Sequence, residues 1–175
     1  GLSDFIGCTA NFNYGDHQST LDFEDIVTMK GSEVNLSKTE GSLIANFYSD
    51  LKLESGSMNI KSAKGTGNVN VEGNYFQSGG TIFLHNNTTA GTSNAVYMTV
   101  KGDFTNISGT ITFDNNNSST IAHILSINGE KFTIGGQAVI NNVVATANPI
   151  YGTIYFDRSG LTSYYENSSS AKVQN

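Results

Sequence analysis

The sequence predicts an all-β protein, a right-handed parallel β-helix (β-solenoid) of roughly six coils. Three observations lead to this fold class: a repeated segment, short runs that alternate apolar and polar residues, and an unusual composition. Glycine supplies 19 of the 175 residues, whereas charged residues make up only 14%. Glycine permits tight corners between strands, and the abundant Asn, Ser and Thr side chains satisfy backbone groups in turns.

One pattern occurs four times: an apolar–x–apolar–x–small segment followed, seven positions later, by a glycine. The small residues and their glycines are Ser49/Gly56, Gly73/Gly80, Gly102/Gly109 and Gly129/Gly136. The copies lie 24, 29 and 27 residues apart. A period of this size indicates stacked units, none of which buries a core by itself. We therefore expect Val71, Val100 and Ile127 to stack in successive coils and to face inward.

A second short strand is expected after each of these glycines. The apolar pairs two and four residues further on are Met58/Ile60, Ile82/Leu84, Ile111/Phe113 and Ala138/Ile140. The residues between them are mostly polar, which is typical of a half-buried strand. Gly152 begins another such strand only 16 residues after Gly136, so we expect it on a different face of a coil. No window shows a helical period.

A sandwich of antiparallel hairpins is the competing architecture. It predicts Asn-Gly turns between paired strands. The one Asn-Gly, Asn128-Gly129, instead lies inside the repeat. Segments 86–95, 114–120 and 141–148 vary between copies and are expected to be loops. With strands ~4.8 Å apart, the solenoid would be a rod of roughly 30 Å.

The chain divides into residues 1–40, expected to be irregular coils or a cap, and residues 41–175, the repeat solenoid. Neither end shows a polar cap, so we expect the solenoid to continue beyond both ends in a longer protein. With 9 Lys+Arg against 15 Asp+Glu and no basic cluster, the composition argues against nucleic acid as a partner. No segment approaches the ~20 apolar residues of a membrane span.

Residues 68–175 carry a family resemblance. The segment 69–82, VNVEGNYFQSGGTI, and the segment 100–111, VKGDFTNISGTI, resemble repeats of large secreted β-helical proteins of Bacteroidetes. The segment 152–160, GTIYFDRSG, is similar to a companion element of the same proteins, but Leu161 departs from it. The resemblance implies a gliding-motility adhesin-like protein at the cell surface or outside the cell. It also implies export as type 9 secretion system cargo, with the secretion channel and associated outer-membrane proteins as partners, and provides no catalytic residue.

An enzymatic alternative rests on acidic residues near the N-terminus. Parallel β-helices also occur in polysaccharide lyases and hydrolases, which need converging carboxylates. Asp22 and Glu24 would share a strand face, with Asp25 beside them. Two carboxylates at this spacing are common, so the favoured interpretation is an exposed rim, and we expect no enzymatic activity and no cofactor.

Two sets of side chains raise the question of a metal. One polar residue follows each small position of the repeat, and we expect these four to stack along one edge: Asp50, Asn74, Asp103 and Glu130. Their side chains could bind calcium or could act only as ordinary turn residues, and the sequence leaves both interpretations open. The three histidines, His17, His85 and His123, are far apart in the sequence. We expect them to be exposed, and no metal site is assigned.

Outward aromatic residues are the better indication of binding. Phe83 and Tyr155 occupy outward positions of repeat strands, and Tyr164 and Tyr165 follow in a polar segment. Aromatic faces on a flat sheet can stack sugars, so surface glycans are a possible partner. The sequence thus predicts a structural or adhesive segment of a secreted cell-surface protein, with a polysaccharide-active enzyme or glycan-binding module as the alternative.

Overall fold

The computed structural model describes residues 2–12, 15–86, 94–115, 122–141 and 152–157, together with the backbone of 164–167 and 172–173. Strands dominate these residues and no helix occurs among them, so the prediction of an all-β protein is confirmed. The paired strands run parallel in both sheets, as the repeat predicted. Paired strands are not consecutive in the sequence, because one or two other strands always lie between them. The chain therefore winds through the sheets in a solenoid-like path.

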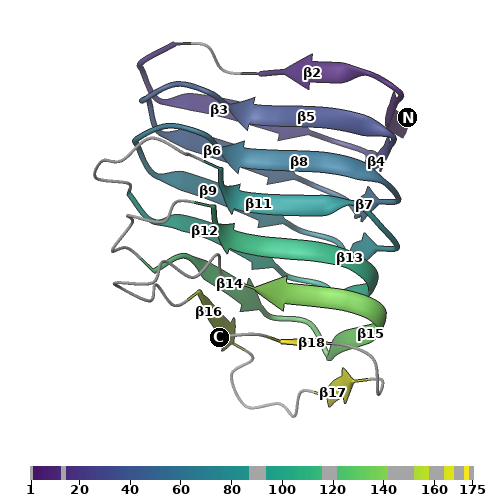
Figure 1. Ribbon diagram of the computed structural model, residues 1–175. Helices are drawn as coiled ribbons and strands as arrows, with labels where there is room; N and C mark the ends of the chain where they lie inside the picture. The colour runs from purple at the N-terminus through teal and green to yellow at the C-terminus, as the bar shows by residue number, and fades with distance from the viewer. Residues whose placement is uncertain are drawn as a thin grey trace.

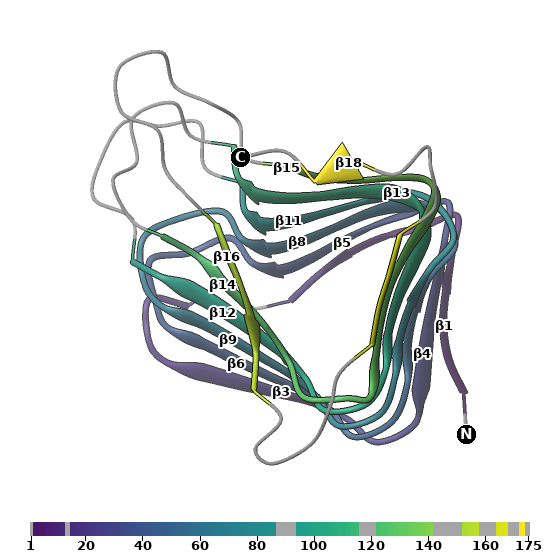
Figure 2. The same cartoon turned by 90° about the horizontal axis from the view of Figure 1, so that it is seen from below.

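The strands form three walls, which Figure 2 shows as a triangular outline. The first wall is the six-stranded sheet: β3 (Ser19–Phe23), β6 (Leu43–Phe47), β9 (Gly67–Val71), β12 (Val96–Val100), β14 (Ile124–Ile127) and β16 (Thr153–Phe156). The second wall contains β1 (Leu2–Ile6), β4 (Ile26–Lys30), β7 (Leu51–Leu53), β10 (Tyr75–Gln77), the first halves of β13 (Phe104–Asp114) and β15 (Lys131–Asn141), and β17 (Tyr164–Asn167). The third wall contains β2 (Thr9–Asn11), β5 (Ser32–Ser37), β8 (Gly56–Lys61), β11 (Thr81–His85), the second halves of β13 and β15, and β18 (Lys172–Val173).

The second and third walls belong to one twelve-stranded sheet because β13 and β15 pass the corner between them without a break. In Figure 1 the strands of successive passes lie one below another, from the N-terminal end to the C-terminal end. We call one passage of the chain through the three walls a coil. The handedness of the winding and the number of coils stay predictions.

The core runs inside the walls as columns of apolar side chains. Val71 lies opposite Val100, and Val100 opposite Ile127, in the first wall. All three are buried, so the prediction that they stack and face inward is confirmed. Aromatic rings stack in the same way, with the centroids of Tyr75 and Phe104 4.8 Å apart. Each coil therefore completes the core of its neighbour, which a single coil cannot do.

The predicted register is wrong in the last repeat. The sequence aligned Gly109 with Gly136, but Gly109 lies opposite Ala138, and Ile111 lies opposite Ile140. The pairing shifts between Asn106 and Ser108, at a β-bulge or irregularity. Extra residues at the corner before β15 and at the irregularity move β15 along β13 by two residues in all. Because side chains alternate between the two faces of a strand, a shift of two residues keeps the apolar side chains facing inward.

Residues 1–40 contain β1 to β5, which pair with the strands of the next coil at a constant offset. The repeat is hard to fit there because Ser32 occupies the place of the corner glycine Gly56. The residue before it, Gly31, has the positive φ instead, 62° against 91° at Gly56. The left-handed residue therefore moves by one position at this corner.

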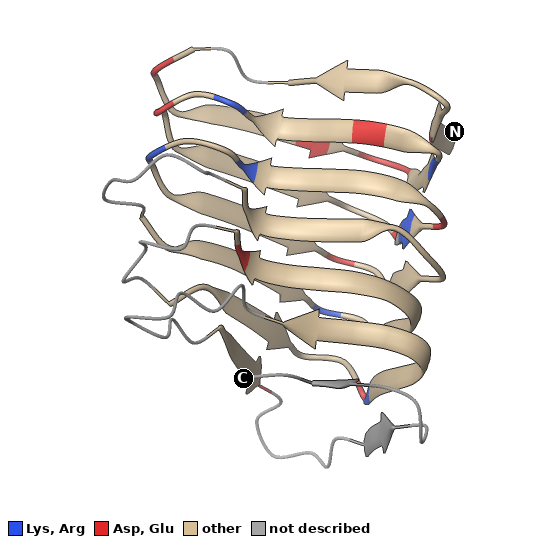
Figure 3. Ribbon diagram, in the orientation of Figure 1, with Lys and Arg blue, Asp and Glu red and all other residues tan. Residues whose placement is uncertain are grey.

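Charges are sparse and scattered in the described ribbon, as Figure 3 shows. No helix in the described part of the chain is long and apolar enough to cross a membrane.

Candidate functional site

Polar side chains stack at the strand ends of the third wall. Ser37 pairs with Lys61, Lys61 with His85, and His85 with Asp114, each from the next coil. All four are buried, and each follows a buried apolar residue of its strand. We call these four residues the corner column, because the chain leaves the third wall directly after them.

A histidine of the following coil joins the corner column. His123 precedes β14 and alternates with the buried residues Leu125 and Ile127, so it occupies an inward position. Its Nε2 lies 3.0 Å from Oδ2 of Asp114, and the other carboxylate oxygen lies 3.1 Å from Nδ1 of His85. The two imidazole rings stack with centroids 5.3 Å apart.

The hydrogen bonds determine where the protons lie. The Val96 backbone N–H donates to Nδ1 of His123 over 3.0 Å, so this nitrogen is an acceptor. The proton of a neutral His123 is therefore on Nε2, from which it is donated to Asp114. His85 donates from Nδ1 to the same carboxylate, and its Nε2 is buried with no hydrogen-bond partner among the described residues.

Asp114 is ionised in this environment. Burial by itself would raise the pKa of its carboxyl, but the hydrogen bonds from His123 and His85 outweigh burial and hold the pKa well below its usual range. Burial lowers the pKa of Lys61 to about 8, and the nearby Glu40 opposes this shift. The Lys61 ammonium donates to Ser37 Oγ at 3.1 Å and to the Thr39 carbonyl oxygen.

The prediction that the histidines are exposed is wrong for two of them. His85 and His123 are fully buried, whereas His17 is exposed. A signal was present in the sequence: His85 and Asp114 are 29 residues apart, the same interval that separates the Val71 and Val100 copies. A histidine and an aspartate at one repeat position must lie on neighbouring strands, so their contact follows from the repeat.

His85, Asp114 and His123 form the group in the described residues that could hold a metal ion. One ligand atom from each lies within 4.8 Å of the others. Imidazole nitrogens with one carboxylate are donors that suit zinc, copper, iron and nickel better than calcium or magnesium. The arrangement is thus either a hydrogen-bonded cluster or the preformed part of a transition-metal site.

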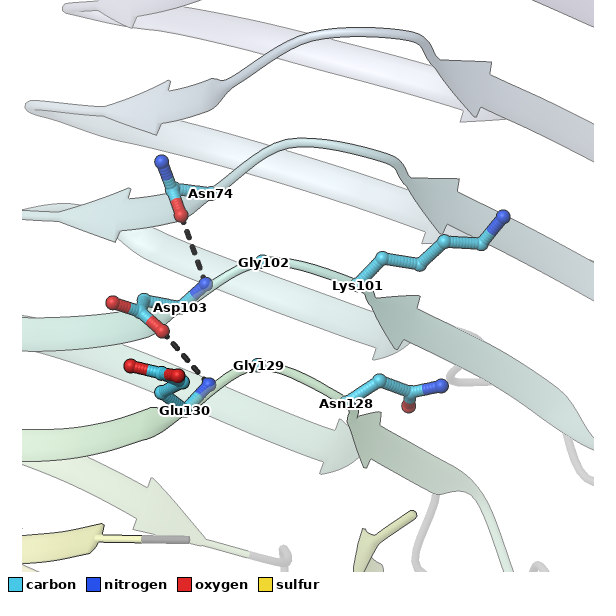
Figure 4. Close-up of a pocket in the computed structure, with 7 residues that line it drawn as sticks. All are labelled: Asn74, Lys101, Gly102, Asp103, Asn128, Gly129 and Glu130. Carbon is cyan, nitrogen blue, oxygen red and sulfur yellow. Dashed lines mark hydrogen bonds between the residues drawn. The ribbon is translucent and has the colours of Figure 1, made fainter. Parts of the chain in front are cut away.

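The predicted column stacks as expected: Asp50, Asn74, Asp103 and Glu130. Its first three side chains accept hydrogen bonds from backbone N–H groups of the next coil. Asp50 accepts from the Asn74 N–H at 2.8 Å, Asn74 from the Asp103 N–H at 2.9 Å, and Asp103 from the Glu130 N–H at 2.9 Å. Figure 4 shows the lower part of this column beside the surface hollow that it lines. Each of these three side chains accepts a hydrogen bond in the turn of the next coil, which is ordinary turn chemistry.

The other residues of the hollow do not converge on the column. In Figure 4, Lys101 and Asn128 point to the opposite side of the turn from Asp103 and Glu130. Lys101 instead forms an ion pair with Glu72 at 2.7 Å. The hollow therefore lacks an arrangement of oxygens around one point.

The acidic residues of the enzymatic alternative lie on the outer surface of the first wall. Asp22 and Glu24 are exposed, and Asp22 accepts a hydrogen bond from Asn46 at 2.8 Å. Asp22, with Glu24 and Glu72, raises the pKa of the neighbouring Tyr48. These contacts describe an exposed, negatively charged surface.

The predicted binding aromatics are spread over different walls. Tyr155 is 55% exposed on β16 of the first wall, and the half-buried Phe83 is on β11 of the third wall. The backbone of Tyr164 and Tyr165 forms part of β17, and their side chains lie outside the described residues. Sequence reasoning missed Tyr48 and Tyr97, which are 48% and 39% exposed on the first wall.

Comparison with protein-family models, curated proteins and solved structures found no match for this chain.

Proposed function

We propose that this chain is a structural and adhesive segment of a large secreted bacterial cell-surface protein, built as a right-handed parallel β-helix of roughly six coils. One observation carries the proposal: parallel ladders connect every described coil to the next, from β1 to β16. The right-handed sense is supported by the strong general preference for right-handed crossovers between parallel strands.

Hydrogen-bonded side chains reinforce the ladders of the third wall. Amide groups of Asn11, Asn35, Asn59, Asn86 and Asn115 form a chain of hydrogen bonds of 2.7–2.9 Å, one link per coil. A second row connects Asp22, Asn46 and Asn70 on the first wall. Such rows resist sliding of one coil past the next, because a slip of one residue separates every pair. This is the property that a stiff spacer needs.

Force spectroscopy tests the mechanical part of this proposal. We would place the chain between two marker domains and pull on its ends. Coils that detach one at a time should release 24 to 29 residues each, or roughly 80–100 Å of extended chain. A featureless extension at negligible force would contradict a load-bearing role.

Export rests on the resemblance of residues 68–175 to secreted proteins of Bacteroidetes. A finished solenoid is too wide for a narrow channel, so the chain would cross the outer membrane unfolded and stack coil upon coil outside. The type 9 secretion channel and its outer-membrane partners are the proposed export machinery. Deleting the channel gene in the source organism should abolish the full-length protein at the cell surface and in the medium. Undiminished export would rule this route out.

Glycan binding is the second candidate, and the exposed tyrosines of the first wall favour it. Tyr48, Tyr97 and Tyr155 combine an aromatic face with a hydroxyl group, which suits contact with sugar rings. A panel of polysaccharides, assayed for binding and for released products, distinguishes the candidates. Binding that Tyr155→Ala weakens and Thr153→Ala leaves intact indicates a glycan-binding module, and released products indicate an enzyme. Absence of both leaves the structural role alone.

A further inference from the structure

The buried cluster of His85, Asp114 and His123 has a feature that stacking does not require. Most other buried positions of this fold hold apolar side chains, which fill space without ionisable groups. Here two imidazoles and an ionised carboxylate meet, and one imidazole nitrogen, Nε2 of His85, is buried without a partner in the described residues. Buried ionisable side chains that gather at one point are candidates for a functional site.

We propose that His85 Nδ1 and Asp114 Oδ1 bind one divalent transition-metal ion of the zinc class, and that His123 holds the carboxylate in position. The two ligand atoms are 3.1 Å apart. With both at ~2.1 Å from a metal ion, this separation corresponds to an angle of about 95° at the metal, between octahedral and tetrahedral values. The ion takes the place between the two atoms that the His85 Nδ1 proton occupies in the metal-free protein.

The second carboxylate oxygen of Asp114, Oδ2, accepts a hydrogen bond from His123, so we assign His123 as a positioning residue rather than a ligand. Its Nδ1 accepts from the Val96 backbone N–H, so its Nε2 carries the proton and donates to Asp114. A metal at that Nε2 would force the proton to Nδ1, directly against the Val96 N–H. A ligating carboxylate whose other oxygen accepts a hydrogen bond from a locked partner is a usual metal-site arrangement.

Metal binding moves a proton within the imidazole ring of His85. On metal binding, the single proton of neutral His85 moves from Nδ1 to Nε2, so the ring stays neutral and the Nδ1 lone pair binds the ion. The Lys61 ammonium, one coil away, opposes a second cation, although its hydrogen bonds hold it toward Ser37 and Thr39.

Metal titration of the purified 175-residue chain, stripped with a chelator, tests the proposal. Zinc chloride in a calorimeter should give one site per chain, and cobalt chloride should produce an absorption band for bound cobalt. His85→Asn and Asp114→Asn should abolish saturable binding. His123→Gln should lower the affinity about 10–100-fold, as loss of an outer-shell partner does. His17→Gln removes an exposed imidazole and should change the affinity less than twofold.

Two measurements keep the test decisive if a variant fails to fold. The melting temperature of the wild-type chain should rise with zinc concentration, and nitrogen NMR should show the His85 proton on Nε2 in the zinc form while His123 keeps its Nε2 proton. Lys61→Met should increase the affinity. A melting temperature independent of zinc, or equal binding by the wild type and His85→Asn, would overturn the proposal.

Discussion

Replacing Asn106 with leucine should stabilise the protein. Asn106 is fully buried, and neither polar atom of its side chain has a hydrogen-bond partner in the described residues. It lies between Gln77 and Ile134 in a column that begins with apolar residues such as Leu53. Gln77, unlike Asn106, is satisfied: it accepts from the Tyr75 hydroxyl and donates to backbone carbonyl groups.

The magnitude follows from the two unpaired atoms. Leaving a buried polar group unsatisfied costs about 1–3 kcal/mol, and leucine has nearly the shape of asparagine with apolar surface to bury. We expect Asn106→Leu to raise the free energy of unfolding by about 2–4 kcal/mol. For a chain of this size that corresponds to an increase in melting temperature of about 4–16 °C.

Thermal and urea unfolding, followed by circular dichroism, measure this change. The matched control is the same substitution at Asn59, which is also buried but donates to Asn35 at 2.8 Å and accepts from Asn86 at 2.7 Å. Asn59→Leu leaves both partners unpaired and should destabilise the protein by a similar amount. If Asn106→Leu is neutral or destabilising, a buried water satisfies Asn106 and the reasoning fails.

Four further substitutions probe other parts of the fold. Val100→Asp places an unpaired charge in the core and should cost several kcal/mol, visible as loss of cooperative unfolding. Gly109→Ala should destabilise by at least ~1 kcal/mol because φ is +112° and a Cβ would lie 2.6 Å from a buried amide nitrogen, whereas Gly15→Ala, with open space around it, should not. Lys61 has a pKa of about 8 when folded against 10.5 as the ordinary value, so the unfolded chain binds more protons in this window. The wild type should therefore gain stability relative to Lys61→Met as the pH rises from 8 to 10.5, in urea titrations at each pH. Asp103→Ala removes the acceptor for two backbone N–H groups of the next coil and should cost about 1 kcal/mol, and calcium should leave the melting temperature of the wild type unchanged.

The repeat determined the parallel stacking of this protein. Alternating apolar residues at a fixed interval can bury their faces only when the copies lie over one another, so Val71, Val100 and Ile127 were predictable as one inward column. The stacking of Asp50, Asn74 and Asp103 followed from the same interval. The chemistry of these side chains did not, because it depends on which backbone N–H groups the turn presents.

Corners and bulges were decided by the tertiary structure. The partner of Ile111 changes from Ala138 to Ile140 because extra residues are absorbed at the corner before β15 and at the irregularity near Asn106. At the corner before Ser32, Gly31 has the positive φ, whereas Ser32 occupies the position that Gly56 holds in the next coil. This displacement makes the copy of the repeat in residues 1–40 hard to recognise. A local pattern cannot reveal such shifts, since either alignment keeps the apolar residues facing inward.

The sequence by itself determined which residues share a position in the repeat, and thus that His85 and Asp114 lie on neighbouring strands. Only the tertiary structure brought His123 to the same carboxylate, from the start of another wall, and aligned the Val96 N–H with its ring. The interval between His123 and Asp114 belongs to no repeat, because it spans a corner whose length differs from coil to coil. Side chains within one register are placed by periodicity, whereas side chains that meet across a corner are placed by the path of the backbone around it.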